Sequence, residues 1–429
     1  MLAPAEADLV RRDPALPGLA TLLDPEALVA ALRRALPGVE CGPAQIGYIK
    51  YKPGTNCLAA YKLAVAGGRV DIHAKAFARG AAQKLGKARQ NPGIPGPLGA
   101  GRIALEDELI VVSVFPNDRK VTALHRFTDG ESRPALLREL LPARPDLWDG
   151  QVENLVYKPE RRLVARLSTG GVPRAAIKVY TEAEYGGARR NAQAFQSRGP
   201  LRLAPLLGHS DELHILAFEW ITGRVLNDAL ADPALPRATV AQVGAALAEL
   251  HAHDPAGLEI LSRETEAEWL HEAARNISWL CPALAERAEG LARRLAARLL
   301  AEPPADRAIH GDFHARQALL TGESVAILDV DRALCGDPML DAGLFIAHLE
   351  RAVIRGELPA GRVEPLTAAL LEGYRSVTRE SVPARVRLYA AVELLRLSAR
   401  FFRYAEPGWP ERTEAGLARA EAIIDDAGL

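Results

Sequence analysis

The chain has 429 residues, a formal net charge of −1 and 48% hydrophobic residues. This length allows two or three domains with a sizeable core, and the near-neutral charge argues against a nucleic-acid partner. The sequence contains no run of eighteen apolar residues and does not start like a signal peptide, so we expect neither a membrane protein nor a secreted one. The scattered cysteines suit a reducing compartment. We therefore expect a cytoplasmic protein, and the Ala- and Arg-rich composition suggests a bacterial source.

Two segments in the first half of the chain resemble each other. Residues 49–77 and 155–180 each predict a strand ending in Tyr-Lys-Pro, a second strand, a Gly-Gly turn and a third strand. The third strand carries Lys75 in the first copy and Lys178 in the second. We interpret the first copy as a separable cap, closed by an edge strand near Val112; chance similarity between two hairpins is the alternative.

The middle and the end of the chain are predicted to be mainly helical. A buried strand at residues 214–222 comes first, after a helical segment that Gly186 and Gly187 are expected to interrupt. Apolar residues then recur every three or four positions, which predicts amphipathic helices. These helices are expected at residues 238–253, 264–280, 282–300, 338–354, 384–402 and 411–429.

The most informative segment is residues 309–331, which read IHGDFHARQALLTGESVAILDVD. It places Asp312 in a tight loop, Gln317 five residues later and Asp329 twelve residues after that. Two oxygen ligands beside a lone carboxylate suit Mg²⁺ and a nearby base. A metal site beside a catalytic base is the arrangement that phosphoryl transfer uses.

A short hairpin is predicted between Gln317 and Asp329. Gly322 and Glu323 form a candidate type II′ turn, in which glycine takes the first central position. The resulting pairs are Thr321 with Ser324, Leu319 with Ala326 and Gln317 with Leu328. This register brings Asp329 beside Gln317 at the open end of the hairpin.

The spacing of this segment resembles the kinase catalytic loop H-R-D-x-x-x-x-N and its following metal-binding Asp. His310, Asp312 and Gln317 keep these offsets, with Gly for Arg and Gln for Asn. The pattern H-G-D-x-H-x-x-Q, then L-D-V-D and G-D-P-x-x-D, resembles the aminoglycoside phosphotransferase (APH)/choline kinase-like family. With His314 and the Gln variant, it is most similar to the maltokinase and glucosamine kinase branch, although Asp-Val-Asp replaces that branch's Asp-Phe-Glu.

The resemblance implies an α+β, bilobal protein-kinase-like (APH) fold with an N-terminal cap domain. The expected domains are a cap at residues 1–145, a small lobe with its hinge at 146–222, and a helical C-lobe at 223–429. The implied cofactors are ATP and Mg²⁺, and the implied partner is a small molecule with a hydroxyl acceptor. The resemblance also implies that Lys178 binds the α- and β-phosphates, and that Glu219 and Ile221 bind adenine through their backbone.

The same resemblance implies roles within residues 309–341. Asp312 is the catalytic base, and Gln317 and Asp329 hold the metal. Supporting residues are His310, His314, Asp331 and Asp341, of which Asp341 is expected to brace the catalytic loop. Two roles stay open. His314 either positions the substrate or only forms hydrogen bonds within the loop, and Asp331 either supports the metal site or forms a turn.

We predict an ATP-dependent kinase that acts on a sugar or amino sugar. One alternative is an antibiotic (aminoglycoside-type) or amino-alcohol kinase, for which Glu266, Glu268 and Glu272 could line an acidic cleft. Another alternative is a nucleotide-binding pseudokinase that serves as an interaction module. The lack of a glycine-rich loop favours this alternative, as does the position of Glu182 and Glu184, which lie unusually close to Lys178 for its partner.

Overall fold

The computed structural model describes residues 2–81, 83–322, 324–378, 385–426 and 428. The chain divides into two compact units, which are described separately. Unit 1 comprises Met1–Tyr185, Leu207–Phe218 and Phe402–Pro407, and unit 2 comprises Gly186–Leu206, Glu219–Phe401 and Gly408–Leu429. Helices and mainly antiparallel sheets occur together, so the predicted α+β class is confirmed. The predicted boundaries of cap, small lobe and C-lobe remain a prediction.

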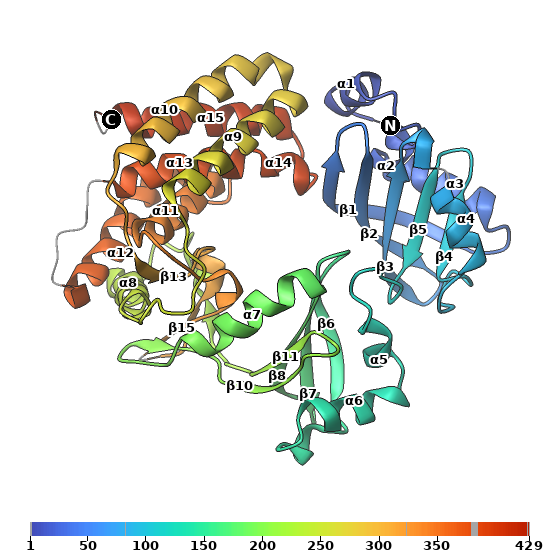
Figure 1. The fold of residues 1–429 in the computed structure, drawn as a ribbon, viewed down its shortest axis with the longest axis horizontal. Coiled ribbons are helices and arrows are strands. Elements are labelled where there is room, and N and C mark those ends of the chain that lie inside the picture. The colour runs from blue at the N-terminus through green and yellow to red at the C-terminus, as the bar shows by residue number, and fades with distance from the viewer. Residues whose placement is uncertain (1, 82, 323, 379–384, 427, 429) are drawn as a thin grey trace. The chain divides into compact units, whose positions relative to one another are not determined.

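The first sheet of unit 1, which we call the cap sheet, has the strand order β1-β2-β3-β5-β4. Its strands are β1 (Cys41–Lys52), β2 (Asn56–Val65), β3 (Gly68–Phe77), β4 (Arg102–Leu105) and β5 (Ile110–Val114). The helices around it are α1 (Pro4–Arg12), α2 (Leu19–Leu23), α3 (Pro25–Ala35), the 3-10 helix η1 (Arg79–Ala81) and α4 (Gln83–Gln90). Helices α2 and α3 pack against the sheet (Figure 1). The Tyr61 hydroxyl of β2 donates to the Leu22 carbonyl of α2.

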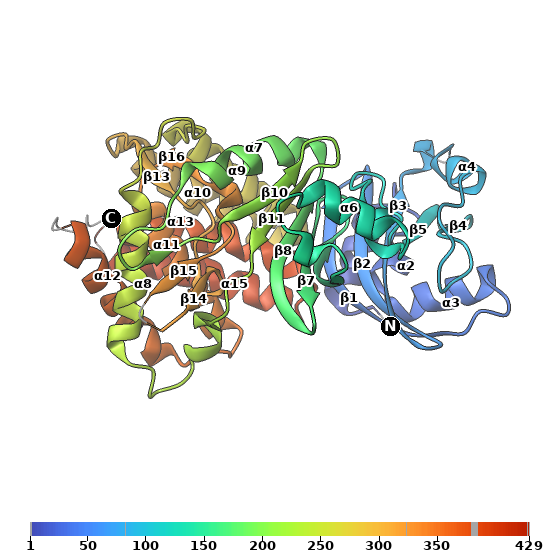
Figure 2. The same cartoon turned by 90° about the horizontal axis from the view of Figure 1, so that it is seen from below.

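The second sheet of unit 1, the small-lobe sheet, has the order β10-β11-β8-β7-β6. Its strands are β6 (Gln151–Lys158), β7 (Arg162–Thr169), β8 (Val172–Tyr180), β10 (Leu206–Ser210) and β11 (Ile215–Glu219). Helix α5 (Leu124–Thr128), helix α6 (Ser132–Leu140) and the 3-10 helix η2 (Pro145–Leu147) precede it. Helix α6 lies beside this sheet (Figure 2). Leu137 and Leu140 of α6 are buried in one cluster with Leu163, Leu167 and Ile177 of the sheet.

The two similar segments fold into the same arrangement, three antiparallel strands in sequence order. Two local predictions about their surroundings are wrong. The strand near Val112 lies between β3 and β4 and is not an edge strand. Helix α7 (Glu182–Ala194) runs through Gly186 and Gly187 without interruption. Tertiary contacts outweigh the low helix propensity of glycine here.

Unit 2 is mainly helical. Its helices are α8 (Arg237–His251), α9 (Arg263–Leu280), α10 (Ala285–Ala301), α11 (Met339–Ile354), α12 (Val363–Thr378), α13 (Val386–Ser398), α14 (Arg400–Arg403) and α15 (Trp409–Asp426). Helix α13 contacts α9, α10, α11 and α15, and it lies among them in Figure 1. The predicted break at Pro282 is confirmed by the 3-10 helix η4 (Pro282–Leu284), which separates α9 from α10.

Two small sheets complete unit 2. One has the order β12-β14-β15-β9, formed by β9 (Leu201–Arg202), β12 (Arg224–Val225), β14 (Ala318–Leu320) and β15 (Val325–Ile327). The other pairs β13 (Arg307–Ile309) with β16 (Leu334–Gly336). The remaining 3-10 helices are η3 (Leu226–Ala229), η5 (Ala315–Gln317), η6 (Val330–Arg332) and η7 (Ala360–Arg362). These short strands and turns carry the predicted catalytic segment.

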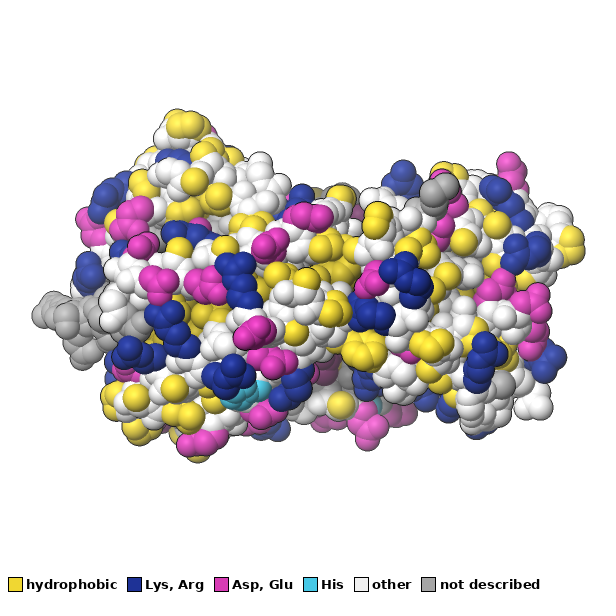
Figure 3. Space-filling view, turned by 90° about the horizontal axis from the view of Figure 1, so that it is seen from above, with side chains coloured by type: hydrophobic (Ala, Val, Ile, Leu, Met, Phe, Trp, Pro, Cys, Tyr) yellow, Lys and Arg dark blue, Asp and Glu magenta, His cyan; other side chains and the backbone are white. Residues whose placement is uncertain are grey.

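The charge distribution on the surface and the lengths of the helices agree with the near-neutral charge and the lack of long apolar runs in the sequence. On the face drawn in Figure 3, basic and acidic side chains are interspersed, and neither sign gathers into one large field. Within the part of the chain that the structure describes, no helix is both long and apolar enough to cross a membrane.

Candidate active site

The catalytic loop begins where β13 ends, at His310-Gly311-Asp312. Gly311 has a φ of +75°, a left-handed conformation that L-residues with a side chain rarely adopt. A Cβ atom at this position would lie 2.3 Å from the carbonyl oxygen of Arg332. Both observations explain why glycine stands where the kinase loop has arginine. The turn leaves Asp312 half-buried directly after it.

His310 is fully buried and connects the catalytic loop to the predicted metal hairpin. Its Nε2 lies 2.8 Å from the Leu328 carbonyl, and the Asp312 amide donates to its Nδ1 at 3.2 Å. These partners assign a neutral ring with the proton on Nε2, since only an unprotonated Nδ1 accepts. His310 therefore fixes Asp312 relative to the strand that leads to Asp329.

Asp341 lies under the same loop and is also fully buried. Its Oδ2 accepts from the His310 amide at 2.6 Å, and its Oδ1 accepts from the Gly311 amide at 2.9 Å. His251 Nε2 lies 2.9 Å from Asp341 Oδ2, and His251 Nδ1 lies 2.9 Å from the Tyr374 hydroxyl. The carboxylate thus ties two loop amides to helices α8 and α12.

The predicted hairpin is present with the predicted register. Leu319 pairs with Ala326, and the Thr321 and Leu328 amides donate to the Ser324 and Gln317 carbonyls. Gly322 has a φ of +91°, as the first central residue of a type II′ turn requires. The turn type also depends on Glu323, which lies outside the described residues. The register is therefore confirmed, while the turn type stays a prediction.

Asp329 and Gln317 meet at the open end of this hairpin. Gln317 Nε2 lies 3.4 Å from Asp329 Oδ2, and both side chains are half-buried. Asp329 takes a left-handed conformation, with φ 64° and ψ 48°. Non-glycine residues in this region are uncommon and cluster at functional sites, because the surrounding structure must hold them there. The strained backbone thus occurs at the residue that we predicted to bind metal.

The pair of Asp329 and Gln317 suits a hard cation that keeps water and phosphate oxygens as its other ligands. The carboxylate supplies charge, and the amide can turn its oxygen toward a cation, because its O and N positions are assigned from hydrogen bonding. Among the described residues, no group of three or more His, Cys, Asp or Glu side chains could hold a metal alone. The site therefore fits Mg²⁺ bound together with a nucleotide better than a resident structural metal.

His314 lies two residues after Asp312 and packs on His348 of α11, with ring centroids 4.3 Å apart. Burial lowers the pKa of His314 to about 4, and burial also lowers the pKa of His348 well below its ordinary value. The Arg316 amide donates to His314 Nδ1 at 3.2 Å, so the proton of the neutral ring is on Nε2. His314 is therefore a neutral hydrogen-bond donor beside the predicted base.

Asp331 does not continue the strand, because Val330–Arg332 form a 3-10 turn directly after Asp329. The side-chain Nδ2 of Asn191 donates to the Asp331 carbonyl at 3.1 Å and to the Ala333 carbonyl at 2.9 Å. The Asp331 backbone thus helps to anchor the turn on α7. Its side chain stays open between the two predicted roles.

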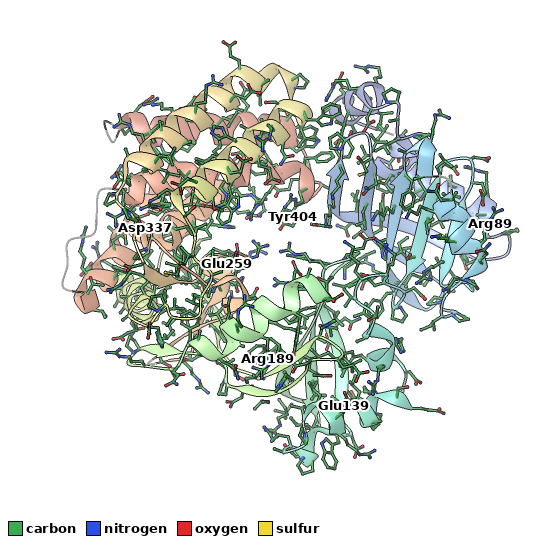
Figure 4. The ribbon with its side chains drawn as sticks, in the orientation of Figure 1. Arg89, Glu139, Arg189, Glu259, Asp337 and Tyr404 are labelled. Carbon is green, nitrogen blue, oxygen red and sulfur yellow. The ribbon has the colours of Figure 1, made fainter. Side chains whose placement is uncertain are left out.

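Asp337 lies just before Pro338, the N-cap residue of α11, and its buried side chain has three partners. It accepts from the Met339 amide at 2.9 Å, and Arg263 and Arg385 each lie 2.7 Å from its Oδ2. The side chain is buried at the beginning of α11, where Figure 4 labels it. The arginines join α9 and the start of α13 to the helix that carries Asp341.

The predicted nucleotide residues lie on the small-lobe sheet and just after it. Lys178 is on β8 opposite Val164, with its Nζ 5.3 Å from the ring centre of Phe218. Glu184 of α7 forms an ion pair with Arg161 at 2.8 Å. In unit 2, the Glu219 amide donates to the Pro205 carbonyl at 2.8 Å, and Ile221 is buried. The structure gives these residues positions, while their roles toward a nucleotide stay predictions.

Four residues around the site were not singled out by the sequence. Each is polar, at least partly buried and supplied by a helix distant in sequence: Asn191, His251, His348 and Tyr374. His251 was predicted only as the end of a helix. The position of His251 in the sequence does not indicate its contact with Asp341, which lies 90 residues further along the chain.

A separate cavity of about 340 Å³ lies in unit 1, between the cap sheet and β6. Tyr48, Lys62, Tyr157 and Lys158 are among its lining residues, and Tyr404, labelled in Figure 4, also contributes. None of the predicted catalytic, metal or nucleotide residues lines it.

The catalytic loop, the hairpin and the small-lobe sheet together define a protein-kinase-like phosphotransferase. A model described as the phosphotransferase enzyme family, APH, matches residues 147–389, more than half of the chain. The chain therefore belongs to this family and is a small-molecule phosphotransferase. A search of curated proteins gave no match.

Several solved structures are similar to this chain at low sequence identity. Choline kinase from Cryptosporidium parvum Iowa II is 13% identical with a TM-score of 0.50, covering 70% of this chain and 97% of its own. A choline/ethanolamine kinase family protein from Mesorhizobium loti is 19% identical, with a TM-score of 0.46 and coverage of 70% and 95%. Aminoglycoside phosphotransferase APH(4)-Ia, in complex with ADP and hygromycin B, is 14% identical, with a TM-score of 0.49 and coverage of 69% and 98%.

Proposed function

We propose that the protein transfers the γ-phosphoryl group of ATP to a hydroxyl of a small molecule, with Mg²⁺ as cofactor. The observation that carries this proposal is the contact of Gln317 with Asp329 at the open end of a hairpin that His310 connects to the loop of Asp312. His310 connects the loop of Asp312 to the strand before Asp329. A scaffold that fixes a carboxylate beside two metal-type ligands suits phosphoryl transfer, which depends on positioning and charge stabilisation.

In this proposal Asp312 orients the acceptor hydroxyl and accepts its proton as the new O–P bond forms. Gln317 and Asp329 would hold Mg²⁺, which neutralises phosphate charge when it is bound. Lys178 would bind the α- and β-phosphates, and the backbone at Glu219 and Ile221 would bind adenine.

We propose a sugar or amino sugar as the acceptor. The support is the sequence resemblance of His314 and Gln317 to the maltokinase and glucosamine kinase branch. His314 also offers a neutral donor two residues from Asp312, which suits a hydroxyl-rich acceptor. We also propose that the protein is bacterial and cytoplasmic, as its composition suggests.

The acidic cleft considered for an aminoglycoside has less support. Glu266 is buried, and it forms an ion pair with Arg263 at 2.9 Å and accepts from the Tyr389 hydroxyl at 2.9 Å. Glu268 forms an exposed ion pair with Arg275 at 2.7 Å. These contacts occupy two of the three acids that could attract a polycationic antibiotic.

The test is ATP consumption with a panel of sugars, amino sugars, amino alcohols and aminoglycosides. We expect phosphorylation of a sugar or amino sugar and at least about a 100-fold loss of turnover in Asp312→Asn, the usual size of a general-base effect. Asp254→Asn makes the same chemical change at an exposed carboxylate, which accepts from the nearby Ala256 amide, and should leave turnover unchanged.

Two outcomes of this panel would contradict the proposal. Phosphorylation of aminoglycosides alone would overturn the acceptor class and leave the reaction in place. Nucleotide binding without turnover of any acceptor would favour the pseudokinase alternative.

A further inference from the structure

The cap sheet presents two lysines on one face. In its register Lys50 pairs with Leu58, and Leu58 pairs with Lys75. Residues directly opposite on neighbouring antiparallel strands point to the same face, so Lys50 and Lys75 flank Leu58 on one side of the sheet. Tyr61, three residues from Leu58, points to the other face and donates to the Leu22 carbonyl of α2. The lysines therefore lie on the face that α2 does not cover.

Lys75 is bonded to the turn between β6 and β7. Its Nζ lies 2.8 Å from Glu160 Oε1 and 2.9 Å from Oε2, and both side chains are largely buried, at 16% and 7% exposed. Burial alone would raise the pKa of Glu160, but the Lys75 ammonium, together with the nearby Arg119 and Lys120, lowers the pKa below its ordinary value. The pair is thus an ionised contact between the cap sheet and the small-lobe sheet.

A second part of the cap holds the same turn. Asp118, just after β5, accepts from the Glu160 amide at 2.7 Å and from the Tyr157 hydroxyl at 2.8 Å. Its other carboxylate oxygen accepts from the Lys120 and Val121 amides at 2.7 and 3.0 Å. Asp118 is therefore fixed by its own turn before it meets β6 and β7.

These contacts hold Glu160 in a conformation that normally belongs to glycine. Its φ is +54°, and a non-glycine residue in this region costs about 1–3 kcal/mol unless the surroundings hold it there. In kinases the turn between the first two small-lobe strands is glycine-rich and covers the nucleotide phosphates. Here Lys158–Arg162 contains no glycine, and Glu160 has the backbone that glycine would have.

Lys50 adds a cation close to this turn. It is half-buried, and no carboxylate of the described residues lies within ion-pair distance of it. Burial and then the neighbouring Lys120 ammonium lower its pKa, while the Glu160 carboxylate opposes this effect. A half-buried ammonium beside other cations is more stable when an anion approaches it.

We infer that the cap sheet is part of the phosphate-binding apparatus: Lys75 and Asp118 set the β6–β7 turn through Glu160, and Lys50 contributes charge to the nucleotide phosphates. Lys75, Asp118 and Glu160 are positioning residues, whereas Lys50 contacts the nucleotide. The inference rests on the proposed function. It also replaces the expectation of a separable cap, in which Lys75 would be dispensable.

The test compares Lys75→Met and Lys50→Met in the full chain with Arg34→Met. Arg34 forms another cap ion pair, 2.6 Å from Glu108 on a different part of unit 1, and serves as the control. We expect the KM for ATP to rise about 10-fold in both lysine variants, as the loss of one charged contact predicts. The KM for the acceptor should change no more than in Arg34→Met. The thermal midpoint should fall further in Lys75→Met than in Arg34→Met, because the largely buried Glu160 carboxylate loses its cation, whereas Arg34 is exposed.

Limited trypsin digestion separates the two roles without relying on turnover. Cleavage after Arg161 should accelerate in Lys75→Met and in Glu160→Gln, because the turn is released. It should keep the wild-type rate in Lys50→Met, and the double variant Lys75→Met/Glu160→Gln should be no worse than either single variant. Mass spectrometry of the fragments identifies the cleaved bond.

Three results would count against the inference. If the wild type binds and uses ATP but Lys75→Met matches Arg34→Met in KM and cleavage, the positioning role is wrong and the proposed function stands. If Lys50→Met keeps the wild-type KM for ATP, the charge contribution is wrong. If the wild type binds no ATP, the proposed function fails together with the phosphate role.

Discussion

Asp341→Asn tests how firmly the catalytic loop depends on one buried carboxylate. Asparagine has the same shape but only one acceptor oxygen, whereas Asp341 accepts from the His310 and Gly311 amides through different oxygens. Either orientation of the new amide leaves one buried backbone N–H facing an NH₂ group. His251 can adapt, because its ring can exchange its proton between the two nitrogens. The His310 and Gly311 backbone amides cannot adapt in this way, because each can only donate a hydrogen bond.

The expected cost follows from these contacts. An unsatisfied buried donor costs about 1–3 kcal/mol, and the remaining bond loses its charge assistance, so unfolding should become easier by about 2–4 kcal/mol. The loop also shifts, and a displacement of about 1 Å at a reacting group lowers the rate about 100-fold. We expect a fall in kcat of this order and a smaller change in the KM for ATP.

Urea unfolding and steady-state kinetics of Asp341→Asn, with Asp254→Asn as the matched control, provide the measurement. The two variants differ only in whether the altered carboxylate is buried under the loop. If Asp341→Asn unfolds at the wild-type urea concentration and keeps kcat within two-fold, the bracing argument is refuted. A loss of stability with unchanged kcat would show that Asp341 supports the fold but does not position Asp312.

The remaining predictions concern the nucleotide, the metal and acid sensitivity. Lys178→Ala should raise the KM for ATP and lower kcat, together at least about 100-fold in kcat/KM; near wild-type kinetics would remove it from the nucleotide site. Asp329→Asn should lower activity about 100-fold and raise the Mg²⁺ concentration that the reaction requires. Gln317→Asn should have a smaller effect, because it keeps a neutral amide oxygen. Titration of activity with Mg²⁺ shows which of the two variants is more impaired. Burial lowers the pKa of His314 to about 4 from 6.5, so the folded state binds fewer protons than the unfolded chain between these values. The free energy of unfolding should therefore fall by about 2 kcal/mol from pH 7 to pH 5 because of His314. Urea unfolding at the two pH values should show a smaller fall for His314→Gln. If the fall is the same in the variant and the wild type, His314 is not its cause.

The sequence was sufficient where local chemistry decides the structure. Gly322 and the alternating residues around it specify a two-residue hairpin, and this hairpin brings Gln317 to Leu328 and Asp329. The bracing role of Asp341 was anticipated from the family resemblance, and Asp341 lies in the first turn of a helix that begins shortly after the hairpin. In both cases the interacting residues lie within about one supersecondary unit.

The sequence was insufficient where distant contacts decide. Lys75 and Glu160 are 85 residues apart, and nothing in the spacing of either lysine strand predicts their ion pair. Likewise, Gly186 and Gly187 have low helix propensity, yet α7 continues through them, with Arg161 bonded to Glu184 in its first turn. Tertiary contacts of this kind outweigh local preference by amounts that a single sequence does not reveal.

The chain of hydrogen bonds from the loop through Asp341 and His251 to Tyr374 has a consequence for local opening. The His310 and Gly311 amides are bonded to a carboxylate that is itself tied to two packed helices. They can exchange hydrogen with solvent only when this arrangement separates, unlike the amides of most surface loops. The catalytic loop should therefore be among the most slowly exchanging segments of unit 2, and its geometry should persist until that unit unfolds.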